Sequence, residues 1–446
     1  MSLSIRRSLE TVSFVLLMLV VSDVRSAGST RTLQVREPEL DRLVRAYFDR
    51  NPDWIGRDDR VQAIRSQQEV ALAYPDPLLS YRWFAAPTET RVGPTRHAFG
   101  WRQPIPGRGK RRVESQRHEL RASVETWESR SVAVAEVSQL QRYYLQAAGR
   151  TERSTLLKQE MELLSRFEEV ALTRYATGEG TQVAVIKLQT DINRLADERS
   201  RLAMESRSFA SEIAALLDGS PLTLDDAALP TRKPGRPPSL APLLEMADNL
   251  HPAVRALQLD LRAHDLETDR TRLSGRPDYT VGVDYVVVGD RRDRIGRLTP
   301  PADNGDDGVS LNVGVRIPLD RSKTRSAVAG VEARRATRSH KLARLRNRLL
   351  SAVRDASTRI ETYAERMTFY DEVLLPQARQ ALSASEAAYR SNRLGSIDLL
   401  DAQRVLFNIR RQRLTLLTDY WLAVVDLQEA TGDLPAMGRS IAEDQR

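Results

Sequence analysis

The sequence contains no cysteine and few aromatic residues, which account for 6% of its 446 positions. Without cysteine there can be no disulfide framework, thiol nucleophile or zinc ribbon, and we expect no lipid-modified cysteine at the amino terminus. Apolar residues make up 41% and charged residues 29%, a balance that favours long exposed helices over a thick globular core. The formal charge of +8 is interleaved with 60 acidic residues, so it does not indicate a nucleic-acid partner.

Long hydrophobic runs are also missing, apart from one near the start. Arg6 and Arg7 precede the mostly apolar run 12–21, and small residues follow at 26–28. This order is typical of a Sec-type signal peptide, and we expect residues 1–26 to be removed. A run of that length is too short for a membrane helix, which needs about 20 residues. The later chain has no uninterrupted apolar stretch of membrane-helix length, so any membrane contact of the mature protein is expected to use β-strands.

The chain repeats its own pattern at a nearly constant offset. The segment WRQPI at 101–105 aligns with VRIPL at 315–319, and Tyr175 aligns with Tyr389. The offset is smaller upstream, and the change falls in an Asp- and Gly-rich loop at 288–308. Such a pattern indicates an old internal duplication. The predicted organisation is a flexible start (27–37), a first repeat (38–219), a proline-rich connector (220–237), a second repeat (238–433) and a polar tail (434–446).

Each repeat is predicted to contain a long helical hairpin. Proline is absent between 107 and 220, and only Pro376 occurs between 319 and 434. Apolar residues recur at heptad spacing from Val185 to Leu216 and from Leu399 to Ala430, which favours coiled-coil packing. The predicted hairpins span about 113–217 and about 322–430.

Two segments of alternating apolar and polar residues precede each hairpin. They have the length of tilted membrane strands, and four strands cannot close a barrel, so several copies must pool them. Trp83, Trp101, Tyr279 and Tyr285 lie on the apolar side of the alternation and are predicted to form an aromatic girdle. The predicted strands span about 77–86, 96–105, 278–288 and 308–318.

The sequence offers little catalytic chemistry. The five histidines are not spaced as metal ligands, and no nucleophile with its base or paired-carboxylate cleft can be placed. We therefore expect a protein that is not an enzyme, with no metal and no cofactor. The basic segment 108–112 has two open interpretations: contact with lipid phosphates where a strand leaves the membrane, or an ordinary solvated helix start.

The order of these elements, with the motifs QPIPGRGKR at 103–111 and YRSNRLGSIDLLDAQ at 389–403, resembles the TolC-type outer membrane efflux proteins over about 38–433. The resemblance implies a mostly α fold with a small β part. Long coiled-coil hairpins would form a periplasmic tunnel, and four membrane strands per chain would complete a twelve-stranded barrel in a homotrimer. It also implies a passive exit duct held in outer membrane lipid and joined by a periplasmic adaptor to an inner membrane pump.

The resemblance further assigns candidate functional residues. The family's aperture aspartates match Asp398 and Asp401, and its latch tyrosine matches Tyr389, so these three form the candidate pore gate. The first repeat has Ala184 and Lys187 in place of the two aspartates, so a hairpin forms without them. The alternative is a pair of solvated acids favoured by the helix dipole. The hairpin turns expected to contact the adaptor contain Gly178, Gly180, Thr181, Asn392 and Gly395, although the glycines could equally serve only the turn geometry.

Two other functional classes remain open. A periplasmic coiled-coil adaptor would carry one hairpin within a β-rich domain, whereas here both the hairpin and the strands are duplicated. A coiled-coil scaffold without a pore would not need strands of membrane length. No residue pattern identifies the exported substrate, which could be a metal ion, a drug or a protein, or the class of pump.

Overall fold

The computed structural model describes residues 35, 37–391 and 393–433. They divide into two compact units. Unit 1 contains the described residues up to Ile55, Ser131–His251 and those from Arg346 onward, and unit 2 contains Gly56–Arg130 and Pro252–Leu345. Both repeats contribute to each unit, because strands and helices of one repeat pack on those of the other. The repeats are therefore not two separately folded domains.

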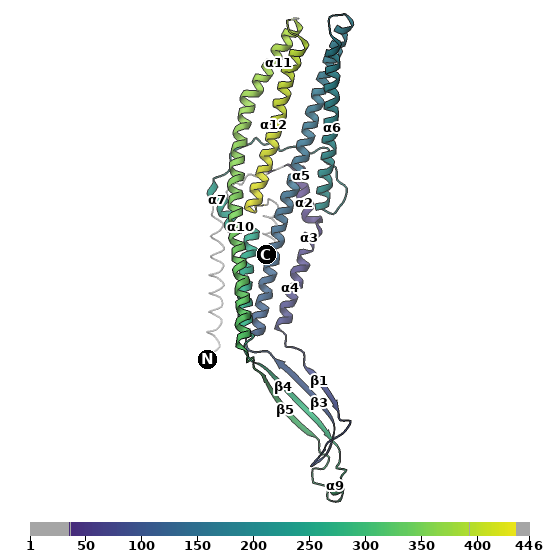
Figure 1. Cartoon of the computed structure of the whole chain (residues 1–446), viewed down its shortest axis with the longest axis vertical. Coiled ribbons are helices and arrows are strands. Elements are labelled where there is room, and N and C mark those ends of the chain that lie inside the picture. Colours follow the sequence, from purple (N-terminus) through teal and green to yellow (C-terminus); the bar gives the residue numbers. More distant parts are fainter. Residues whose placement is uncertain (1–34, 36, 392, 434–446) are drawn as a thin grey trace, which may run out of the picture. The chain divides into compact units, whose positions relative to one another are not determined.

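Unit 2 contains an antiparallel sheet with the path β1–β3–β4–β5, and β2 pairs with the start of β3 (Figure 1). β3 and β4 come from different repeats and are hydrogen-bonded neighbours. β1 is shorter than the expected strand at about 77–86, because the chain bends at 85–86. β3 begins before the expected strand at about 96–105, because Gly93 already pairs with β2. β4 has the expected bounds, and β5 ends before Pro318, which has no N–H to donate. The strands are β1 (Leu78–Trp83), β2 (Glu89–Thr90), β3 (Gly93–Ile105), β4 (Asp278–Val288) and β5 (Gly308–Arg316).

The first hairpin consists of α5 (Lys110–Ala176) and α6 (Gln182–Leu216). In unit 1, Leu188, Leu195 and Leu202 of α6 are buried at seven-residue intervals and form one cluster with Leu157 and Leu164 of α5. Full burial of a leucine side chain contributes about 1.5–3 kcal/mol, so this row stabilises the hairpin. The heptad pattern in the sequence is thus the hairpin core.

The second hairpin is interrupted where the sequence suggests a continuous helix. It consists of α10 (Arg321–Phe369), the π-helical turn η3 (Tyr370–Leu374), α11 (Leu375–Arg390) and α12 (Ser396–Thr431). Pro376 cannot donate to the carbonyl four residues earlier, and its ring clashes with that carbonyl. The helix therefore forms a π-helical turn before the proline, in which each hydrogen bond spans five residues instead of four. A second π-helical turn, η2 (Met246–Leu250), likewise precedes Pro252.

The connector at 220–237 has no helix or strand and lies against the helices of unit 1. The backbone N–H of Leu229 donates to Glu152 Oε1 at 2.9 Å, and that of Gly235 donates to the Tyr420 hydroxyl at 2.9 Å. Burial raises the pKa of the Glu152 carboxyl, partly offset by the Leu229 hydrogen bond. The remaining helices are α2 (Pro38–Arg50), α3 (Pro52–Ile55), α4 (Arg57–Leu72), α7 (Leu240–Glu245), α8 (Pro252–Leu273) and α9 (Arg294–Leu298).

No helix among residues 35, 37–391 and 393–433 combines the length and the hydrophobicity needed to cross a membrane.

Candidate membrane face and hairpin turns

One face of the sheet in unit 2 carries apolar side chains from all four long strands. The exposed fractions of eight of these side chains range from 36% at Val283 to 80% at Leu311. Soluble proteins rarely expose a continuous apolar patch of this kind, so the face is suited to an apolar environment. The register aligns Leu79, Trp101, Val283 and Leu311 in one row and Tyr81, Phe99, Tyr285 and Val309 in the next.

The four predicted girdle residues lie on this face at different levels. Tyr279 and Trp83 pair with positions 105 and 97 of β3, which are eight residues apart. Eight residues span about 27 Å at about 3.4 Å each, similar to the apolar band of about 25 Å in membrane strands. Trp101 and Tyr285 lie between these two ends. The girdle remains a prediction, but its members share a face of suitable length.

Two further aromatic residues of this face, Tyr81 and Phe99, were not among the four predicted girdle residues. The ring centroids of Tyr81 and Phe99 are 5.2 Å apart, and the Tyr81 hydroxyl lies 3.0 Å from His97 Nδ1. Each precedes a predicted girdle tryptophan by two residues, so the same period-two alternation could have identified both.

The opposite face of the sheet is polar. Asp284 accepts a hydrogen bond from Asn312 Nδ2 and lies 3.8 Å from the Arg102 guanidinium. Gly100 lies beside it, where an added Cβ would be 2.4 Å from Asp284 Oδ1 and 2.5 Å from Ser80 Oγ. The sheet is therefore apolar on one side and hydrogen-bonded on the other.

The basic segment at 108–112 is partly used inside unit 2. Lys110 Nζ lies 2.7 Å from Asp278 Oδ1, at the start of β4, and Arg111 donates to the Leu72 carbonyl at 2.6 Å. The Arg111 guanidinium also stacks 3.6 Å from the Tyr74 ring centroid. These two residues fasten the start of α5 to its neighbours. Only Arg108 and Arg112 of this segment are exposed, so the two interpretations above now concern them alone.

The turns of both hairpins lie at the same end of unit 1 (Figure 1). Gly178 has a φ of 77°, which disfavours other residues, and an added Cβ there would meet no atom within 4 Å. At Gly180 an added Cβ would be 2.9 Å from the Tyr175 nitrogen, and the Thr181 hydroxyl accepts from the Ala184 N–H to cap α6. Gly180 and Thr181 thus have structural roles, whereas Gly178 faces open space. Gly395 is exposed, and Asn392 lies outside the described residues.

Two of the three candidate gate residues, Tyr389 and Asp401, contact arginines that the sequence analysis did not select. The Arg174 guanidinium of α5 lies 4.4 Å from the Tyr389 ring centroid. Asp401 is exposed and lies 3.5 Å from Arg404, one turn further along α12. Asp398 is also exposed, in the first turn of α12. No hydrogen bond between the described residues joins Tyr389 to either aspartate.

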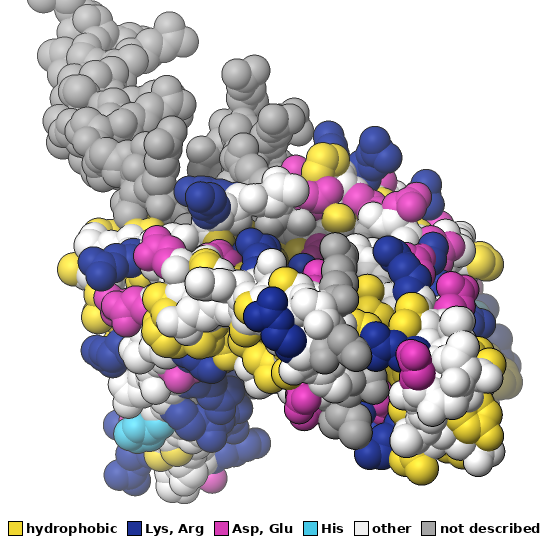
Figure 2. Space-filling view, turned by 90° about the horizontal axis from the view of Figure 1, so that it is seen from above, with side chains coloured by type: hydrophobic (Ala, Val, Ile, Leu, Met, Phe, Trp, Pro, Cys, Tyr) yellow, Lys and Arg dark blue, Asp and Glu magenta, His cyan; other side chains and the backbone are white. Residues whose placement is uncertain are grey.

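A polar groove of about 410 Å³ in unit 1 is lined by α5, α6 and α12. Arg404 of α12 pairs with Asp191 of α6, and Arg411 of α12 pairs with Glu160 of α5 at 3.0 Å. Only 7% of Glu160 is exposed, and this burial raises the pKa of its carboxyl, while Arg411 lowers it. These pairs connect the second hairpin to the first. The sequence analysis did not predict these ion pairs, because heptad spacing does not show which hairpins pack against each other. Figure 2 shows acidic and basic side chains interspersed on the visible face.

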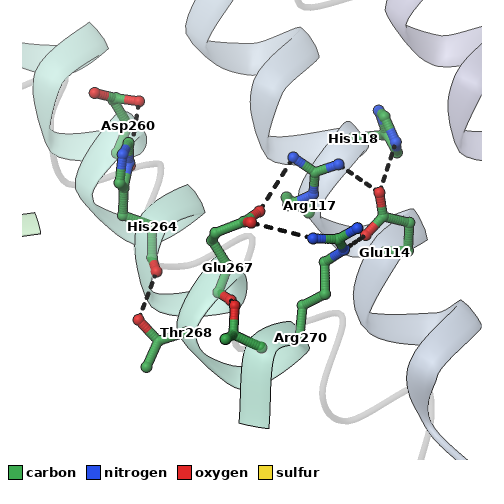
Figure 3. A network of polar contacts seen from close by, with 9 residues as sticks. Glu114, Arg117, His118, Asp260, His264, Glu267, Thr268 and Arg270 are labelled. Carbon is green, nitrogen blue, oxygen red and sulfur yellow. Dashed lines mark hydrogen bonds and ion pairs between the residues drawn. The ribbon is translucent and has the colours of Figure 1, made fainter. Parts of the chain in front are cut away.

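In unit 2, a partly buried polar network joins α5 to α8 (Figure 3). Arg117 pairs with Glu114 on its own helix and with Glu267 of α8 at 3.2 Å. His118 Nε2 lies 3.3 Å from Glu114, and burial lowers the pKa of His118, so its neutral form is favoured near neutrality. Arg270 of α8 contacts both glutamates. The charges compensate one another, which gives the network a structural role. Among the described residues, no three His, Asp or Glu side chains are placed to hold a metal ion.

Comparisons with known proteins agree with this arrangement. Residues 243–433 match the family model Outer membrane efflux protein, and a comparison with curated proteins gives no match. Similar solved structures include a membrane protein from Pseudomonas aeruginosa (19% identity, covering 89% of this chain and 91% of that chain, TM-score 0.70). Another is the outer membrane protein VceC from Vibrio cholerae (16% identity, covering 88% of this chain and 96% of that chain, TM-score 0.70). A third is the open state of the Neisseria gonorrhoeae MtrE outer membrane channel (14% identity, covering 89% of each chain, TM-score 0.68).

The family match falls on the second repeat, where the sequence motifs are most specific. The structural matches cover 88–89% of this chain, and their TM-scores of 0.68–0.70 establish a shared fold. Together they confirm the predicted resemblance and the predicted fold class. Residues 243–433 match the Outer membrane efflux protein family model, and nearly the whole chain has the fold of the TolC-type outer membrane channels.

Proposed function

We propose that the protein is the outer membrane exit duct of a tripartite export system, coupled through a periplasmic adaptor to an inner membrane pump. The observation that carries the proposal is the sheet of unit 2, which has one exposed apolar face and one polar face. A sheet with this division suits a wall between lipid and water. The duct is passive, and the chain needs no catalytic group for this role.

The sheet also supports a trimeric assembly. β1 and β5 are the two ends of the strand path, so each has an edge with no partner strand among the described residues. Open edges do not persist in lipid, because unpaired N–H and C=O groups cost several kcal/mol each. Pairing β1 of one copy with β5 of the next satisfies both edges, and three copies of the four strands give twelve.

A charge on the apolar face tests the proposal. Leu311 is 80% exposed near the middle of β5, and Leu311→Arg should cost about 2–4 kcal/mol per chain in the membrane. Ser310→Arg is the matched control, because Ser310 directly precedes Leu311 and lies on the polar face beside Asp284. Native mass measurement in detergent should give a trimer for the wild type and for Ser310→Arg, and a depleted trimer for Leu311→Arg.

Two outcomes would overturn the proposal. Recovery of the wild-type protein as a soluble periplasmic monomer would favour an adaptor or a scaffold without a pore. Equal membrane assembly of the two arginine variants would show that the apolar face does not contact lipid.

We further propose roles for the hairpin turns. Gly178 and Gly395 are suited to contact the adaptor, since exposed turn glycines let a partner backbone approach closely. In a trimer, Asp398 and Asp401 would provide two rings of three carboxylates each. Such rings concentrate cations and repel anions at an aperture. Tyr389, held against Arg174, is the proposed latch between the hairpins.

A further inference from the structure

We propose that the loop between β4 and β5 binds the phosphate groups of anionic lipids at the membrane surface. This inference rests on the proposed function, which places the sheet in a membrane. The loop spans 289–307 and contains α9, whereas the corresponding loop between β1 and β3 spans only 84–92. It lies at the end of the sheet away from the helices of unit 2 (Figure 1). The extra segment is therefore not needed to build a strand pair.

The short helix α9 presents apolar side chains outward. Ile295 and Leu298 are 67% and 74% exposed, and their three-residue spacing puts them on one side of the helix. Gly296 is buried on the other side, where an added Cβ would lie 2.6 Å from Arg291 Cβ and 2.5 Å from Asp293 Oδ1. Glycine thus lets α9 sit closely on the loop, and this seating fixes which side chains face out.

Three exposed arginines surround these apolar side chains. Arg292, Arg294 and Arg297 have no acidic partner among the described residues. Arg297 Nε donates to the Arg292 carbonyl at 2.7 Å, which leaves its terminal nitrogens available. Apolar side chains flanked by guanidinium groups are the pattern with which interfacial segments bind anionic lipid surfaces.

Most acidic side chains of the loop are engaged within unit 2. Asp293 pairs with Arg291 at 2.8 Å, and Asp303 pairs with Arg91. Asp307 accepts from the Tyr285 hydroxyl and from the Val288 N–H. The two other loop acids, Asp290 and Asp306, lie outside the segment 291–298, which contains four arginines and one paired aspartate. The outward charge of that segment is positive and complements phosphate.

The loop also has internal bonds that fix its position before any lipid binds. The Gly305 N–H donates to the Val92 carbonyl at 2.7 Å, and the Gly289 N–H donates to the Pro94 carbonyl at 2.9 Å. The Arg292 N–H donates to Glu89 Oε1 at 3.1 Å. Val287 belongs to the last apolar row of the sheet and comes seven residues before Arg294, the first residue of α9. The helix therefore follows closely on the proposed membrane face.

Lipid binding by the full-length protein in detergent tests the inference. The probes are dioleoylphosphatidylglycerol, which is anionic, and dioleoylphosphatidylcholine, both in mixed micelles and counted by native mass spectrometry. The wild type should retain the anionic lipid in preference. The triple variant Arg292→Gln, Arg294→Gln, Arg297→Gln should bind it on the order of 100-fold more weakly, from about fivefold per arginine. Ile295→Ser with Leu298→Ser should weaken binding of both lipids.

The matched control is Arg334→Gln, Arg344→Gln, Arg348→Gln. It removes the same charge from exposed positions of α10 that have no acidic partner among the described residues, and it should change lipid binding less than twofold. Equal losses in the two triple variants, or no loss in the α9 variant, would overturn the inference. So would displacement of the lipid by inorganic phosphate, which would indicate a site for free phosphate.

The outcome is separable from that of the proposed function. The α9 variant should still assemble and conduct ions in planar bilayers, because no substituted residue belongs to the sheet. A wild type that assembles and conducts, with unaltered lipid binding in the α9 variant, would refute the lipid site alone. A wild type that neither assembles nor conducts would refute the duct and the lipid site together.

Discussion

Removal of Arg411 should loosen the second hairpin from the first. Its guanidinium neutralises Glu160, a carboxylate of which only 7% is exposed, at a distance of 3.0 Å. Breaking a buried pair by removing one partner costs about 3–5 kcal/mol. Because 21% of the Arg411 side chain is exposed, we expect Arg411→Leu to cost about 3 kcal/mol, the lower end of this range.

The cost should depend on pH in a defined direction. Burial raises the pKa of Glu160, the nearby Glu198 and Asp191 raise it further, and Arg411 and Arg404 lower it. In Arg411→Leu the main opposing cation is gone, so this pKa rises more. A carboxyl with a raised folded-state pKa contributes stability below its unfolded value, and this contribution is lost as pH rises through the folded value. The variant should therefore differ less from the wild type at about pH 5 than at about pH 8.

Amide hydrogen exchange of α12 in the assembled protein measures this local opening without requiring two-state unfolding. About 3 kcal/mol corresponds to exchange roughly 100-fold faster around position 411, after correction for the intrinsic rate at each pH. Lys158→Leu on α5 is the control, because its 4.0 Å pair with Glu162 is exposed and worth about 0–1 kcal/mol. The reasoning fails if Arg411→Leu behaves like Lys158→Leu, or if its effect is the same at both pH values.

Two further predictions concern the hairpin turns. In planar bilayers, polyvalent cations added from the periplasmic side should block the wild-type current, and Asp398→Ala with Asp401→Ala should relieve this block; an identical block would show that these residues do not line the pore. Gly178→Trp and Gly395→Trp should abolish export while the protein still reaches the outer membrane, because the indole would occupy the space left for the adaptor. Normal export by both variants would contradict a role of these turns in coupling.

The local elements could be predicted because their determinants are local. The alternation from Tyr279 to Val287 specifies a strand with one apolar face, and β4 has the predicted bounds. The heptad row that contains Leu188, Leu195 and Leu202 is the buried row of the hairpin. A period of two or of seven reports directly which side of an element faces its neighbours.

The interruptions of the helices follow from proline but were not predicted. Pro376 lies within an otherwise regular pattern, and the sequence analysis predicted an uninterrupted hairpin over about 322–430. The π-helical turn before Pro376 accommodates the proline by widening, and another precedes Pro252. Sequence shows that a proline must disturb the hydrogen bonding, but the packing of the neighbouring helix decides whether the helix ends or widens.

Only the tertiary structure decided which charged residues meet. Glu160 and Arg411 are 251 positions apart, and Lys110 and Asp278 are 168 apart, at distances that no periodicity connects. The same holds for Arg174 and Tyr389. The sequence by itself determined the duplication, the two periodicities and hence the faces of each element. An ion pair depends instead on the position of two side chains after separate elements have packed, and many arginines of this chain could have served each acid until packing brought one within reach.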